Sequence, residues 1–83
     1  MSKAEKLLAA LRQNPRADWR LEHLQTVAKR FGVEWRHDGG SHCVFIAPDG
    51  RTLPVPARRP IKPVYIPLFL ALLADRAPTH AEE

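Results

Sequence analysis

His42 is the side chain best suited to chemistry in this chain of 83 residues, because it follows a glycine pair at the start of an apolar run. The stretch "GGSHCVFIA" places the imidazole where a turn gives way to a predicted strand, which favours an exposed ring. An imidazole can donate or accept a proton near neutral pH. The spacing fits acid–base chemistry, but by itself it favours a surface or half-buried histidine without a role.

A metal site and a cysteine nucleophile are the other chemistries that this stretch suggests. His37, His42 and Cys43 lie close together in the sequence, but zinc takes four protein ligands, or three and a water. We therefore expect no metal and no cofactor. Cys43 stands between apolar residues without a neighbour to activate its thiol, so we expect it to be buried. As a single cysteine it forms no disulfide within the chain.

Positive charge is concentrated in the middle of the chain. The net charge is +4 and the isoelectric point is about 9.8, and basic residues outnumber acidic ones between Lys29 and Lys62. A basic surface favours a polyanionic partner such as nucleic acid, and solvated surface charge is the alternative. The candidate phosphate-binding side chains are Arg36, Arg51, Arg58, Arg59 and Lys62.

Two helices are predicted before these residues. Residues 3–13 are rich in helix formers with leucines at helical spacing, and Asn14 precedes a proline that ends the helix. Asp18 is predicted to cap a second helix through its carboxylate. That helix carries an apolar stripe and is expected to end at Gly32, as the glycine that follows a helix C-terminus.

After the second helix the spacing of apolar residues changes from 3.6 residues to two, which indicates strands. Three strands are predicted, over residues 33–38, 41–48 and 51–55. Turns at 39–40 and 48–50 would join them into an antiparallel meander. Pro54 indicates an edge position for the third strand. Alternation places His42 and Cys43 on opposite faces of the second strand. Both faces are apolar, so the pattern does not decide which one is buried.

An extended connection and a last helix complete the predicted fold. Residues 56–63 combine prolines with cations, and the apolar stretch from Val64 has helical spacing with Pro67 in its first turn. The order helix, helix, three strands, helix predicts an α+β two-layer sandwich whose sheet has one open face. Trp19 and Trp35 are expected in its core, with base stacking as the alternative.

Length and hydropathy favour one small domain without a membrane partner. A chain of this size builds a single core. No apolar run approaches the roughly 20 residues that a spanning helix needs, and no signal-type cleavage pattern is present. We therefore expect a cytoplasmic location.

The order and spacing of these motifs resemble the HicA toxins of type II toxin–antitoxin modules. The resemblance covers residues 19–74 and rests on Gly40-Ser41-His42 before the apolar strand, the turn "PDGR" and the strand-ending "VP". It implies a double-stranded-RNA-binding-domain-like fold, α-β-β-β-α, with residues 15–75 as its core. Residues 1–14 would add a helix, and residues 76–83 would form a flexible tail.

The same resemblance implies a metal-independent endoribonuclease that cleaves mRNA, inhibits translation and is held inactive by a HicB-like antitoxin. The active-site histidine of the family falls on His42, and its glycine and serine neighbours fall on Gly40 and Ser41. Many members carry a histidine directly after the strand-ending proline, where this chain has Ala57. A non-catalytic RNA-binding module and a protein-interaction module of the same fold stay open as alternatives.

Overall fold

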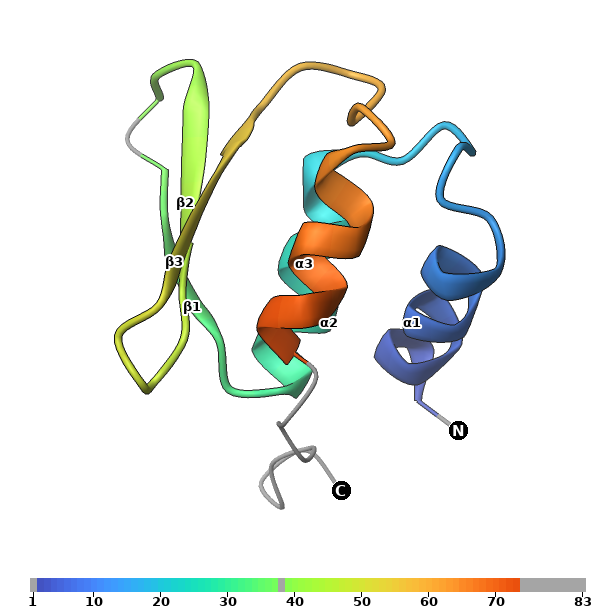
Figure 1. Ribbon diagram of the computed structural model, residues 1–83, viewed down its shortest axis with the longest axis horizontal. Coiled ribbons are helices and arrows are strands. Elements are labelled where there is room, and N and C mark those ends of the chain that lie inside the picture. Colours follow the sequence, from blue (N-terminus) through green and yellow to red (C-terminus); the bar gives the residue numbers. More distant parts are fainter. Residues whose placement is uncertain (1, 38, 74–83) are drawn as a thin grey trace.

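The computed structural model describes residues 2–37 and 39–73, and in these residues it contains three helices and one sheet (Figure 1). The elements are α1 (Lys3–Gln13), α2 (Leu21–Arg30), β1 (Glu34–Arg36), β2 (His42–Ile46), β3 (Thr52–Pro56) and α3 (Tyr65–Leu73). The sheet is antiparallel in the order β1-β2-β3, and α2 and α3 cover one of its faces. The predicted α+β class and order of elements are confirmed. The tail predicted at 76–83 lies outside the described residues.

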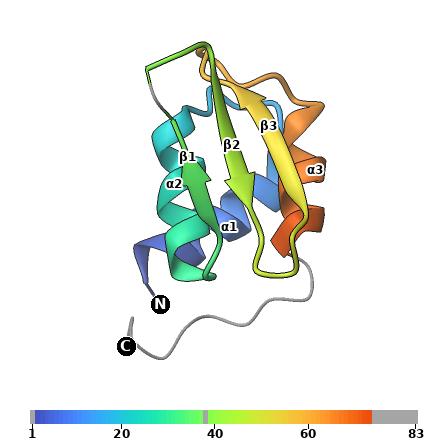
Figure 2. The same cartoon turned by 90° about the vertical axis from the view of Figure 1, so that its left-hand side faces the viewer.

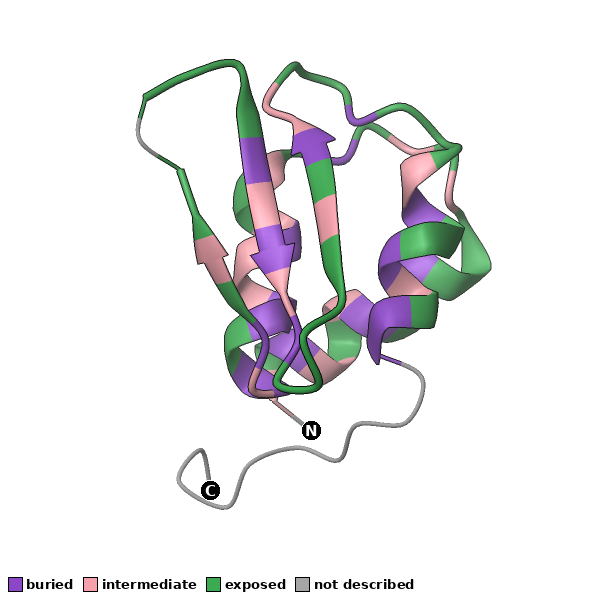
Figure 3. Ribbon diagram, turned by 60° about the vertical axis from the view of Figure 1, so that its left-hand side comes forward, coloured by how far each residue is buried: buried purple, intermediate pink, exposed green. Residues whose placement is uncertain are grey.

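Alternation along the strands gives the sheet one buried face and one open face (Figure 3). Cys43, Phe45 and Val55 are fully buried under the helices. The ring of Phe45 meets the ring of Phe69 from α3 edge to face, with centroids 5.1 Å apart. His42 starts the other row of β2 and is exposed. The choice that the sequence pattern left open is therefore decided by the helices, which cover the Cys43 face.

Helix α1 forms a further layer on the side of α2 and α3 that faces away from the sheet (Figures 1 and 2). Its Leu8 and Leu11 are buried in the common core. Arg30 at the end of α2 is also buried, and its Nη2 donates to Oε2 of Glu5 at 2.9 Å. This hydrogen bond holds the pKa of Glu5 below its ordinary value. The predicted two-layer sandwich thus describes the sheet with α2 and α3, and α1 adds a third layer.

The predicted cap of α2 is wrong. The helix begins at Leu21 with Arg20 as its N-cap residue, and the Arg20 N–H donates to Nδ1 of His23 at 3.0 Å. The carboxylate of Asp18 is engaged elsewhere, since Nη2 of Arg59 donates to its Oδ2 at 2.9 Å. Because α2 begins three residues after Asp18, this residue does not stand at the N-cap position and its carboxylate does not cap the helix.

The strands differ from their predicted bounds, and the register explains the prolines of β3. The first strand ends at Arg36 rather than at residue 38, and the third is displaced to Thr52–Pro56. Backbone hydrogen bonds join Ala57 to Ser41 and Ala47 to Arg51, each at 2.8 Å. Because bonded and non-bonded pairs alternate, the pairs His42–Pro56 and Val44–Pro54 exchange no hydrogen bonds. Both prolines therefore turn their nitrogens to the outer edge, which confirms the edge position predicted from Pro54.

The end of α2 gives a test of local backbone strain. Gly32 has a φ of +77°, and the next residue, Val33, donates its N–H to the Ala28 carbonyl at 2.9 Å, as in a Schellman motif. We expect Gly32→Ala to lower the free energy of unfolding by about 1–2 kcal/mol, because a Cβ disfavours this conformation. Urea denaturation measures the loss. Gly40→Ala is the control, since Gly40 has no positive φ; an equal loss in both variants would contradict the explanation.

Candidate functional site

His42 is exposed at the start of β2, in the row of residues that alternates with the buried Cys43 and Phe45 and therefore on the open face of the sheet. Ser41 Oγ lies 2.9 Å from Nδ1 of His42, and this contact orients the imidazole. The backbone carbonyl of Ser41 accepts the N–H of Ala57 at 2.8 Å. The first residue after β3 is therefore held beside the histidine.

A hollow of about 500 Å³ opens next to this imidazole. It is lined by Ser41, His42, Pro56, Ala57, Arg58 and Lys62. Both charged groups at its border are cations, and neither comes from the strand that carries the histidine. An anion in the hollow would meet the Arg58 guanidinium, the Lys62 ammonium and the imidazole together, which is a suitable setting for a phosphate group.

The connection between β3 and α3 carries the two cations, and it is tied down at three points. Ala57 is bonded to Ser41 as described above. Arg59 forms its ion pair with Asp18, and the guanidinium holds the pKa of that carboxyl below its ordinary value. Ile61 is buried, and its N–H donates to the carbonyl of Trp19 at 2.8 Å. These contacts fix the backbone on either side of Arg58 and next to Lys62.

The other predicted site residues lie outside this hollow. Arg51 pairs with Asp49 at 2.8 Å in the β2–β3 turn, at the end of β2 opposite to His42. Arg59 is held by Asp18, and Gly40 precedes Ser41 in the β1–β2 loop. Arg36 shares the open face and stands across from Val44, diagonal to the histidine. It extends the basic surface along the sheet without bordering the hollow.

The structure assigns Cys43 and the tryptophans to packing. Burial raises the pKa of the Cys43 thiol, and Nε2 of Gln25 donates to its sulfur at 3.8 Å. Trp19 is buried, and Trp35 is half-buried with its ring 6.3 Å from that of Phe45. Over residues 2–37 and 39–73, no three His, Cys, Asp or Glu side chains gather in a way that could hold a metal ion. Across the same ranges, none of the helices has the length and apolar character to cross a bilayer.

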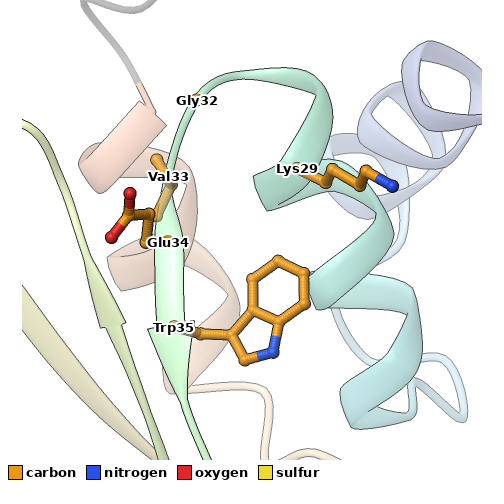
Figure 4. Close-up of a pocket in the computed structure, with 5 residues that line it drawn as sticks. All are labelled: Lys29, Gly32, Val33, Glu34 and Trp35. Atoms are coloured by element: carbon orange, nitrogen blue, oxygen red, sulfur yellow. The ribbon is translucent and has the colours of Figure 1, made fainter.

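Two residues of the hollow were not predicted from the sequence as lining residues. Pro56 and Ala57 reach it only because the register of β3 places them beside Ser41 and His42. The "VP" at the end of the third strand was the available sequence signal for these residues. The register that places Pro56 opposite His42 could not be assigned from the sequence alone. A second hollow, of about 560 Å³, lies at the free edge of β1 between Lys29 and Trp35 (Figure 4). It contains none of the predicted site residues.

Comparisons of this chain with models of protein families, with curated proteins and with solved structures found no match. The groups that border the hollow at His42 are therefore the structural basis for assigning a function.

The buried Ile61 gives a test of how the connection is held. We expect Ile61→Ala to cost about 2–5 kcal/mol of unfolding free energy, because it leaves a cavity between the connection and the core. Ile46→Ala is the matched control, since Ile46 is only half-buried on the open face and should cost less. Denaturation with urea measures both. A larger loss in the control would contradict the anchoring role of Ile61.

Proposed function

We propose that this protein is a HicA-type endoribonuclease that cleaves mRNA in the cytoplasm, with His42 as its catalytic acid–base group. The observation that carries the proposal is the hollow whose lining combines an oriented imidazole with two cations from a different segment. The motif Gly40-Ser41-His42 supports it independently. A double-stranded-RNA-binding-domain-like identity for the sheet with α2 and α3 is part of the same proposal.

The proposed reaction uses the RNA as its own nucleophile. A phosphate sits between Arg58 and Lys62, and Nε2 of His42 removes the proton from the adjacent ribose 2′-hydroxyl. The 2′-oxygen attacks phosphorus, and the bond to the 5′-oxygen breaks. That oxygen takes up a proton from water, leaving a 2′,3′-cyclic phosphate and a 5′-hydroxyl end. The two cations stabilise the negative charge that develops on phosphorus oxygens, and no metal ion is required for this step.

Ser41 has a positioning role in this scheme. Its hydroxyl is hydrogen-bonded to Nδ1 of the imidazole, which leaves Nε2 to contact the substrate. Arg36 on the same sheet face would contact a neighbouring phosphate of the strand. The proposed inhibitor is a HicB-like antitoxin with an acidic surface, since such a surface would cover the basic hollow and exclude RNA.

Cleavage of a labelled single-stranded RNA in the presence of EDTA tests the proposal. We expect His42→Ala to reduce the rate by about 10²–10⁴-fold, which is the usual contribution of general acid–base catalysis. His42 is exposed, so the variant should keep the circular dichroism spectrum of the parent. Cleavage by His42→Ala at the rate of the parent would refute the mechanism.

Binding of RNA without cleavage is the second candidate, and Ala57 favours it. This residue borders the hollow at the position where many HicA toxins carry a further histidine, so the site offers a single imidazole. This candidate predicts salt-dependent RNA binding and no cleavage products at any enzyme concentration.

The cations of the hollow can be tested under either candidate. We expect Arg58→Ala to weaken RNA binding and to reduce the slope of log affinity against log salt by about 1, because one phosphate contact is lost. Arg12→Ala is the charge-matched control, since Arg12 is exposed on α1, on the far side of the helices from the sheet. Filter binding at several salt concentrations measures both. Equal slopes for the two variants would show that RNA does not use the hollow.

A further inference from the structure

The two edges of the sheet are built differently. At the outer edge of β3, Pro54 and Pro56 occupy the positions whose N–H groups would point outward, so another strand cannot pair there. The outer edge of β1 has no proline. Within the described residues, β1 is paired with β2 on one side only. The fold therefore blocks one edge against strand addition and leaves the other edge able to accept it.

The register shows which groups β1 presents at its free edge. In β2 the odd-numbered residues direct their backbone N–H and carbonyl groups toward β3. The even-numbered Val44 and Ile46 therefore direct theirs toward β1. Their partners Arg36 and Glu34 bond inward. Trp35 then directs both its N–H and its carbonyl outward, which is the donor and acceptor pair that an added antiparallel strand would engage.

The sequence of β1, Glu34-Trp35-Arg36, is complementary to itself in an antiparallel arrangement. If two copies pair with Trp35 opposite Trp35 of the second copy, the two residues exchange both backbone hydrogen bonds. Each Glu34 then stands directly across from an Arg36 on the open face. This is a non-hydrogen-bonded pair, in which opposite side chains come closest. We propose that two copies of this chain associate through their β1 edges in this register, forming a continuous six-stranded sheet.

The helix beneath β1 fits the same two-fold arrangement. The Trp35 ring lies between β1 and α2, beside the hollow that Lys29 also lines (Figure 4). Glu22 lies two turns earlier on the same face of α2 as Lys29, and both are exposed. A two-fold axis at Trp35 reverses α2 in the second copy. The Lys29 end of one helix thereby lies toward the Glu22 end of the other, where Oε1 of Glu22 is 3.5 Å from Nη1 of Arg20 in its own chain.

This association goes beyond the proposed activity. A two-fold axis perpendicular to the sheet keeps both open faces on the same side. The two hollows at His42 would then lie on one continuous surface, separated by the paired β1 strands and their Arg36 side chains. Such a surface suits a long polyanion that spans both copies.

Charge reversal tests the association without RNA, so its outcome is independent of the ribonuclease proposal. We expect the full chain to show a concentration-dependent monomer–dimer equilibrium in sedimentation equilibrium experiments. Glu34→Arg and Arg36→Glu should each weaken the homodimer at least about tenfold, because like charges then stand opposite each other twice. An equal mixture of the two variants should restore the dimer as a mixed species in native mass spectrometry, since every facing pair is again opposite in charge.

The controls separate this interface from others. Both residues are exposed, so circular dichroism should report an unchanged fold. Arg12→Glu on α1 should leave the equilibrium as in the parent, because α1 lies behind the helices. A parent chain that stays monomeric at millimolar concentration would overturn the proposal. So would a dimer that neither reversal weakens, or a mixture of variants that does not pair.

Discussion

Trp19 makes the contacts on which the arrangement of the other elements depends. Its indole Nε1 donates to the carbonyl of Asn14 at 2.8 Å, just after α1, and its ring meets His23 of α2 edge to face at 5.3 Å. Its own carbonyl accepts the N–H of Ile61 at 2.8 Å. One buried residue thus joins the end of α1, the start of α2 and the connection that follows β3. A small domain has few buried residues, so a single residue that contacts three segments has a large effect on how these segments are held together.

The candidate site depends on this junction rather than on the strand that carries its histidine. Arg58 and Lys62 belong to a proline-rich connection without regular structure, and such a segment lacks the regular backbone hydrogen bonds of a helix or strand. Hydrogen bonds to Ser41, Asp18 and Trp19 hold it instead. The cations stay close to the imidazole because neighbouring residues of the connection are bound to the core, which is the preorganisation that electrostatic stabilisation of a phosphate needs.

Local signals were sufficient for most of the fold and for part of the site. Helical periodicity, the glycine after α2 and the turn residues predicted the elements in their order, because each depends on neighbours within a few positions. The cap assigned to Asp18 failed because α2 begins only at Leu21, and the carboxylate of Asp18 instead binds Arg59, which is far away in the sequence. Arg51 failed to join the hollow for a different reason. It shares the basic character of Arg58, but the β2–β3 turn holds it with Asp49 at the other end of the sheet.

The sequence by itself determined the α+β class, the three-stranded meander, the edge position of Pro54 and the turn that precedes His42. It also supplied the motif Gly40-Ser41-His42, from which the HicA-type activity is proposed. Only the tertiary structure decided that the Cys43 face of β2 is buried, since both faces of that strand are apolar and the helices had to cover one of them. Only the tertiary structure selected Arg58 and Lys62 from the five basic candidates. The physical reason is the same in both cases: packing and strand pairing join segments far apart in the chain, and local spacing does not record such partners.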